Sequence, residues 1–95
     1  MMAGEADGVP PLPSREAREH WTAVFDAEFD RFCKLLETGT ETFLDPYAAE
    51  HEAEFFAVAS EAFFESPNAL RRDFPRLYDL FMGFYRQDPS RRLAA

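Results

Sequence analysis

The sequence predicts an all-α fold, and two observations lead to this prediction. Apolar side chains recur at intervals of three and four residues over residues 14–37, which is the spacing that gathers them on one face of a helix. No stretch alternates apolar and polar residues for long enough to form a strand, and no internal repeat is present. The 95 residues suffice for one small domain with a modest core.

The N-terminal half is expected to contain one long helix between two loops. Glycine and proline exclude a helix interior over residues 1–13, so we expect a loop there. Ser14 is a suitable N-cap for a helix over residues 14–37, which ends before Gly39. Residues 38–49 are expected to form a second loop. The apolar face of the long helix consists of Trp21, Val24, Phe25, Phe29, Phe32, Leu35 and Leu36.

The C-terminal half is expected to contain a second helix over residues 50–65 and short helices after it. Pro67 and Pro75 each follow a point where a helix stops, and proline suits the first position of the next helix. We therefore expect one or two short helices over residues 67–87. A further proline then ends the last helix, and residues 88–95 are expected to form a frayed tail.

Composition and charge exclude several classes of function. The formal net charge of -8 argues against nucleic acid as a partner, because phosphate binding needs clustered lysine and arginine. No apolar run approaches the roughly 20 residues that span a bilayer, so we expect no membrane association. Cys33 is the only cysteine, which excludes an intrachain disulfide and fits a reducing compartment. We expect a soluble, cytoplasmic protein.

Aromatic residues are unusually frequent for a chain of this size, with 11 phenylalanines, 3 tyrosines and 1 tryptophan. A small domain cannot easily enclose so many rings. We therefore expect some of them to face a partner surface.

Three glutamates, Glu54, Glu61 and Glu65, return to nearly the same side of the helix over residues 50–65. Most of the remaining circumference is apolar, so the helix is expected to be buried on more than one side. This acidic line has two explanations. It faces water, as most helical glutamates do, or Glu54 faces inward toward a metal ion.

The chain alone lacks the ligands of a catalytic zinc site, which needs three protein ligands and usually takes two from a His-Glu-x-x-His helix. The partial match begins at His51, but Phe55 occupies the place of the second histidine. His51 and Glu54 lie one turn apart and could share an ion. Two ligands do not make a catalytic site.

Several motifs, in the same order along the chain, resemble the C-terminal part of the Mlc titration factor A family. They are Asp45-Pro46-Tyr47-Ala48-Ala49, Glu54-Phe55-Phe56-Ala57-Val58, Ser60-Glu61, Phe63-Phe64, Phe74-Pro75, Leu77-Tyr78 and Phe84-Tyr85-Arg86-Gln87-Asp88-Pro89. That family consists of bacterial zinc-dependent peptidases of the gluzincin type, which also includes anthrax lethal factor. The resemblance covers nearly the whole chain and implies that it is the C-terminal piece of a metallopeptidase catalytic domain.

The resemblance also implies roles for individual residues. Glu54 would be the third zinc ligand, and the Tyr47 hydroxyl would donate a hydrogen bond to the oxyanion of the tetrahedral intermediate. Glu61 would orient a histidine ligand, with a solvated carboxylate as the alternative. The loop over residues 1–13 would follow the missing zinc-binding helix. The other two ligands and the general base would lie upstream of Met1, so the chain alone is expected to be inactive.

Two hypotheses about function follow. In the first, the intact protein hydrolyses peptide bonds through a zinc-activated water, and the resemblance implies short peptide substrates and a glucose-responsive transcriptional repressor as partner. In the second, the chain is a non-catalytic helical module that contacts a repressor or another protein through exposed phenylalanines. The acidic charge, the aromatic residues and the missing metal motif fit the second hypothesis.

Overall fold

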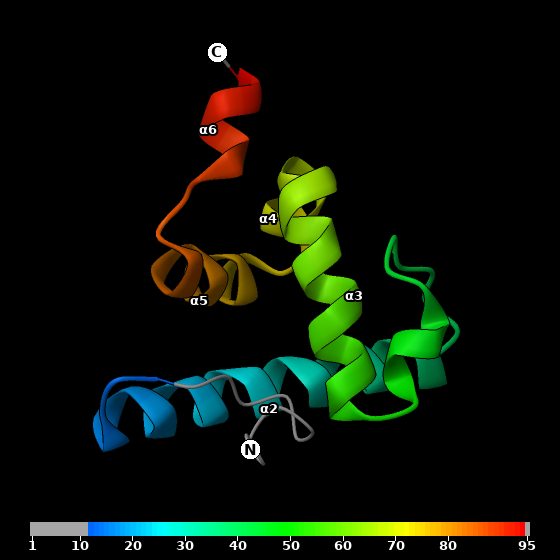
Figure 1. The fold of residues 1–95 in the computed structure, drawn as a ribbon. Coiled ribbons are helices and arrows are strands. Elements are labelled where there is room, and N and C mark those ends of the chain that lie inside the picture. The colour runs from blue at the N-terminus through cyan, green and yellow to red at the C-terminus, as the bar shows by residue number, and fades with distance from the viewer. Residues whose placement is uncertain (1–11, 95) are drawn as a thin grey trace.

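A computed structural model describes residues 12–94, which form helices and no strands (Figure 1). The predicted all-α fold is confirmed. Residues 1–11, and with them most of the predicted N-terminal loop, lie outside the described residues. The elements are α2 (Arg15–Glu37), the 3-10 helix η1 (Pro46–Ala49), α3 (Glu52–Glu65), α4 (Pro67–Asp73), α5 (Pro75–Tyr85) and α6 (Pro89–Ala94).

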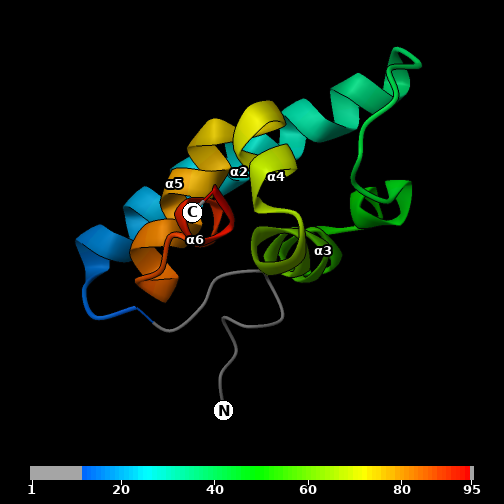
Figure 2. The same ribbon diagram turned by 90° about the horizontal axis from the view of Figure 1, so that it is seen from above.

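The long helix α2 forms one side of the molecule, and η1, α3 and α5 pack against it (Figure 1, Figure 2). α5 contacts the first half of α2, where Trp21 stacks on Phe81 with ring centroids 5.6 Å apart. α3 contacts the second half, where Phe32 stacks on Phe55 at 5.4 Å. α4 joins α3 to α5. α3 also reaches the first half of α2, where the ring of Phe56 lies 5.7 Å from that of Trp21.

The core between these helices is largely aromatic. Phe55 is fully buried, and its ring lies 5.3 Å from the rings of both Phe25 and Phe29. Phe63 is also fully buried, with its ring 5.0 Å from that of Tyr78. Tilted and edge-to-face pairs of this kind add stability beyond the area that they bury.

Few rings are left exposed for the partner surface that some of them were expected to face. Phe55 and Phe63 on the second predicted helix are enclosed by rings from α2 and α5. Among the large hydrophobic side chains that the structure describes, only Tyr47 and Phe64 are exposed, at 55% and 41%. The helices therefore bury most of their aromatic surface among themselves.

Sequence signals account for both ends of α2. The Ser14 side chain accepts a hydrogen bond from the Ala17 backbone N–H at 3.0 Å, as an N-cap does. At the other end, Gly39 adopts a positive φ of 79°, which glycine tolerates without strain. The predicted boundaries of this helix are therefore correct to within one residue.

The connection that follows α2 is more ordered than the predicted loop, because it contains η1. The Asp45 carboxylate accepts a hydrogen bond from the Tyr47 backbone N–H at 2.9 Å, and Pro46 occupies the first position of the short helix. Leu44 and Ala48 are buried and hold this segment against the core.

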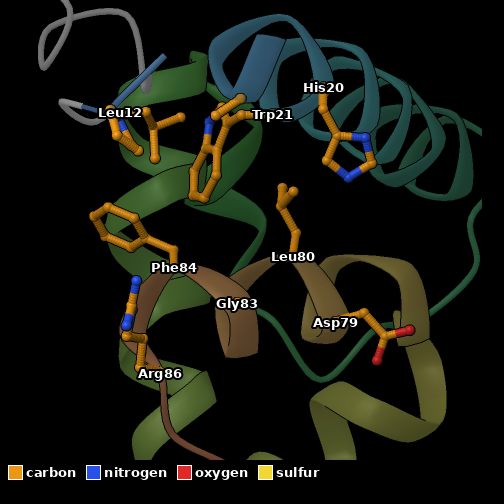
Figure 3. Close-up of a pocket in the computed structure, with 10 residues that line it drawn as sticks. Leu12, His20, Trp21, Asp79, Leu80, Gly83, Phe84 and Arg86 are labelled. Atoms are coloured by element: carbon orange, nitrogen blue, oxygen red, sulfur yellow. The ribbon is translucent and has the colours of Figure 1, made fainter.

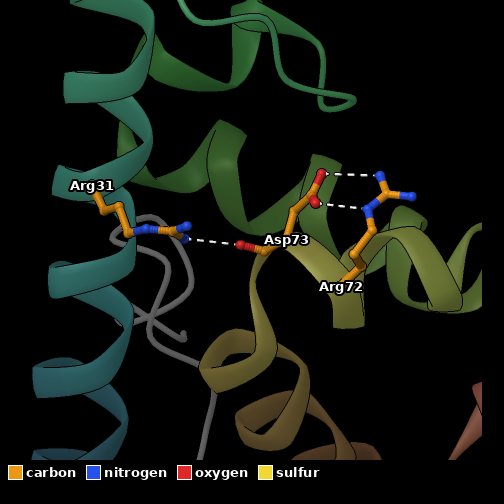
Figure 4. Close-up of polar contacts among 3 residues, drawn as sticks. All are labelled: Arg31, Arg72 and Asp73. Carbon is orange, nitrogen blue, oxygen red and sulfur yellow. Dashed lines mark hydrogen bonds and ion pairs between the residues drawn. The ribbon is translucent and has the colours of Figure 1, made fainter.

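The two prolines predicted to start helices do so, at the first positions of α4 and α5. Arg31 of α2 donates a hydrogen bond to the Asp73 backbone carbonyl at 3.0 Å, at the C-terminal end of α4 (Figure 4). Arg72 binds the Asp73 carboxylate through two hydrogen bonds of 2.8 and 3.1 Å. Arg31 thus satisfies one of the carbonyls that a helix end leaves unpaired.

The predicted frayed tail over residues 88–95 is wrong for residues 89–94, which form α6, and Ala95 lies outside the described residues. The Tyr78 hydroxyl donates a hydrogen bond to the Asp88 carboxylate and accepts one from the Ser90 backbone N–H at 3.0 Å. Ser90 also donates its hydroxyl proton to Asp88 at 3.0 Å and is buried. These contacts tie the start of α6 to α5. Within residues 12–94, no helix combines the length and the apolar content that a membrane span needs.

Candidate metal and oxyanion site

Tyr47 projects from η1 with its hydroxyl available. The neighbouring Ala48 is fully buried, whereas 55% of Tyr47 is exposed, so the short helix is anchored through the alanine while the tyrosine ring faces solvent. No described residue forms a hydrogen bond with the Tyr47 hydroxyl. Since a phenol donates one proton, this group is free to bind an incoming oxygen atom.

Glu54 lies in the first turn of α3 and is half-buried. The next residue, Phe55, is fully buried against α2 and fixes this turn in place. A carboxylate is favoured here because the N-terminal end of a helix carries partial positive charge. Within residues 12–94, no hydrogen bond or ion pair occupies the Glu54 carboxylate, so both oxygens remain available to a ligand.

The structure places Tyr47 and Glu54 on adjoining elements, because η1 packs against α3. His51 lies between them as the residue preceding α3, with extended backbone and an exposed side chain that does not cap the helix. A shallow cavity of about 410 Å³ adjoins this region, lined in part by His51, Phe29 and Cys33. Burial, and then the charges of nearby acidic residues, raise the pKa of the Cys33 thiol and keep it protonated.

Glu61 and Glu65 lie on the same helix as Glu54, but both are exposed. Glu61 is seven residues from Glu54, which is about 10 Å along the helix axis at 1.5 Å per residue. Of the three glutamates in the acidic line, Glu61 and Glu65 therefore face solvent in this chain, while Glu54 is partly covered.

The donor set fits part of a zinc site. Among the described residues, no three side chains of His, Cys, Asp or Glu are arranged to hold one metal ion. Glu54 offers an available carboxylate of the kind that binds zinc beside two histidines, and Tyr47 offers a neutral donor on the adjoining element. The arrangement can supply one ligand and one oxyanion donor to a site completed by other residues.

Sequence reasoning missed a second group of candidate residues, His20, Asp79 and Arg86, which line a cavity between α2 and α5. The available signal was Gly83, a glycine inside an otherwise amphipathic helix.

Comparison with known proteins agrees with the motifs. Residues 1–86 match the sequence model of the family described as glucose-regulated metallo-peptidase M90. The chain is 43% identical over 94 residues to Mlc titration factor A from Pectobacterium atrosepticum, an alignment that covers 96% of this chain and 35% of that protein. It is also 43% identical over 93 residues to Mlc titration factor A from Edwardsiella ictaluri, covering 96% of this chain and 35% of that protein.

An uncharacterized protein from Synechocystis is 35% identical over 86 residues, covering 90% of this chain and 31% of that protein. No solved structure matches the chain. The chain spans about a third of the length of the curated relatives that it matches. Because the family match extends over most of the sequence, the chain belongs to the glucose-regulated metallo-peptidase M90 family.

Proposed function

We propose that this chain is the C-terminal part of a zinc-dependent peptidase, to which it supplies the third zinc ligand, Glu54, and an oxyanion donor, Tyr47. The observation that carries this proposal is the available carboxylate in the first turn of α3, beside the element that bears an available phenol. Membership of a metallo-peptidase family supports it. The remaining two ligands and the general base belong to sequence outside this chain.

The residues of this chain contribute to the reaction in two ways. Glu54 provides an anionic oxygen ligand, held in position because Phe55 fastens the first turn of α3 to α2. The Tyr47 hydroxyl donates a hydrogen bond to the carbonyl oxygen of the scissile peptide as negative charge develops there. A bound zinc ion supplies Lewis acidity in such a site. We further propose that Glu61, about 10 Å along α3 and exposed in this chain, orients a histidine ligand from outside this chain.

The partner and substrate are proposed from the relatives. Two of them carry the name Mlc titration factor A, which points to the Mlc repressor as a partner of those proteins. We extend this to a glucose-responsive transcriptional repressor for the intact form of this protein, acting in the cytoplasm. Short peptides of the aminopeptidase type are the proposed substrates.

The experiment uses a longer version that carries the upstream His-Glu-x-x-His helix. Glu54→Gln should lower zinc content and peptidase activity together, because a neutral amide oxygen is a weaker zinc ligand than a carboxylate. Tyr47→Phe should keep zinc content and lower kcat by roughly 10- to 1000-fold, the range for loss of one oxyanion donor. Glu65→Gln, on the same helix and exposed, is the matched control and should change neither.

Two results would contradict the proposal. Wild-type zinc content in Glu54→Gln would remove Glu54 from the ligand set. Equal losses of activity in the Glu54, Tyr47 and Glu65 variants would show that the substitutions disturb the fold rather than the site.

The alternative function, a non-catalytic binding module, has one observation in its favour. Phe64 is 41% exposed beside Tyr85, with their rings 4.9 Å apart, and it offers an apolar contact on α3. In that case the 95-residue chain should bind the repressor without metal. Phe64→Ala should abolish this binding and Glu54→Gln should leave it intact. No binding by the isolated chain would exclude the module.

A further inference from the structure

A cavity of about 440 Å³ lies between the first half of α2 and the second half of α5 (Figure 3). Trp21, Leu80 and Phe84 form its apolar walls. Neither Tyr47 nor Glu54 lines it, although Phe56 of α3 contacts its wall at Trp21, with ring centroids 5.7 Å apart. The cavity is therefore a separate feature of the molecule.

Gly83 leaves one wall of the cavity open. It occupies an interior position of α5, where glycine is less favourable than alanine because its backbone loses more freedom on folding. A Cβ atom built at Gly83 would meet no other atom within 4 Å, and its φ lies in the ordinary range. Neither packing nor backbone geometry requires glycine there. The missing side chain leaves this face of α5 open.

Two opposite charges flank the apolar walls. Figure 3 shows Asp79 on one side and Arg86 on the other, with the face of α5 that bears Gly83 between them. Within residues 12–94, neither side chain forms a hydrogen bond or ion pair. Their separation of seven residues corresponds to about 10 Å along α5.

The backbone of Arg86 is itself unusual. It adopts the left-handed conformation, with φ 57° and ψ 41°, at the end of α5. Glycine is the usual residue at such a helix end, and a side chain there is strained. The guanidinium of Arg86 therefore lies at the rim of the cavity although the backbone conformation at this position favours glycine.

We propose that this cavity binds a short peptide with free termini and an apolar side chain. Asp79 receives the ammonium group, and Arg86 binds the carboxylate through paired N–H donors. The apolar side chain packs against the partly exposed Leu80 and Phe84, beside Gly83. An extended peptide of about three residues spans roughly 10 Å, which matches the separation of the two charges. This site needs no metal and is independent of Tyr47 and Glu54.

The test uses Trp21, the only tryptophan of the chain, as the reporter of binding. Titration of the 95-residue chain with the tripeptide Leu-Leu-Leu should give a saturable change in fluorescence. N-acetylated and C-amidated forms should each bind about tenfold or more weakly, since each loses one charge-assisted contact. Asp79→Asn and Arg86→Gln should weaken binding of the free tripeptide to a similar extent.

Matched variants separate the site from general effects. Arg76→Gln, an exposed arginine on the same helix, should leave the affinity unchanged. Gly83→Leu should abolish binding by filling the cavity, and Gly83→Ala should weaken it while keeping the helical circular dichroism signal. Asp79→Asn should bind the free and the N-acetylated peptide with similar affinity, because the contact between the Asp79 carboxylate and the ammonium group is already lost.

Three results would overturn the proposal. The first is no saturable change up to about 10 millimolar peptide, a concentration that would nearly saturate a site with a dissociation constant of about 1 millimolar. The second is equal affinity for free and blocked peptides, which would indicate apolar contact alone. The third is an unchanged peptide affinity in Gly83→Leu, which would place the binding site elsewhere on the chain.

Discussion

Replacement of Phe55 by alanine tests the packing of α3 on α2, the contact that holds the first turn of α3. Phe55 is fully buried, and its ring lies within 5.4 Å of the rings of Phe25, Phe29 and Phe32, all on α2. Phe→Ala at such a position removes buried apolar surface and leaves a cavity, which costs about 3–5 kcal/mol. A domain of this length has a total stability of about 5–14 kcal/mol, so the loss is a large fraction of it.

The assay is thermal unfolding followed by circular dichroism, repeated in denaturant. Each kcal/mol corresponds to about 4–8 °C in a domain of this size, so Tm should fall by at least about 12 °C. Phe64→Ala is the matched control: the same residue type on the same helix, but 41% exposed, with an expected cost of about 1–2 kcal/mol. Equal losses in the two variants, or a loss below 1 kcal/mol for Phe55→Ala, would refute the described packing of α3 on α2.

Three further predictions follow from polar contacts and from one glycine. The hydrogen bond from Tyr78 is the main cause that lowers the pKa of Asp88. The ionised Asp88 therefore stabilises the fold above the ordinary carboxyl pKa of about 4, and this stabilisation is lost as pH falls through the lowered pKa. Tyr78→Phe should weaken the dependence of Tm on pH in this acid range. Gly83→Ala should raise stability by about 0.5–1 kcal/mol in denaturant unfolding, and a loss would mean that the site has no room for a methyl group. Arg31→Met should cost about 1–3 kcal/mol because it leaves the buried Glu28 carboxylate without its partner, and Glu28→Gln in the same chain should recover part of this loss.

Local signals in the sequence were sufficient to predict the helices. Apolar spacing located α2, Ser14 marked its start, and Pro67 and Pro75 marked the starts of two short helices. Each of these signals acts within a few residues of the structure that it specifies. These signals can therefore be interpreted without knowledge of the tertiary fold.

The elements that escaped prediction depend on contacts between distant residues. α6 forms because Tyr78 on α5 binds Asp88 and Ser90, and no local pattern reveals that a tyrosine ten residues earlier organises this segment. The aromatic core has the same origin: Phe63 is enclosed by rings from α5, which a single helical pattern cannot specify. Burial was therefore underestimated.

The candidate site shows the same division. Helical periodicity correctly placed Glu54 and Glu61 on one helix, seven residues apart, but could not distinguish the half-buried carboxylate from the exposed one. That difference arises from how the first turn of α3 lies against α2 and η1. The roles of Tyr47, Glu54 and Glu61 rest on family motifs and stay proposals. The cavity beside Asp79 and Arg86 required the relative placement of α2 and α5.

The most direct test of the central claim is a zinc-loaded structure of the version that carries the upstream zinc-binding helix. The measurement is the distance between the zinc ion and the nearest carboxylate oxygen of Glu54. We predict about 2.0–2.2 Å, as for a carboxylate ligand beside two histidines. A zinc ion bound by three other protein side chains, with the Glu54 carboxylate beyond 4 Å, would contradict the assignment of Glu54 as the third ligand.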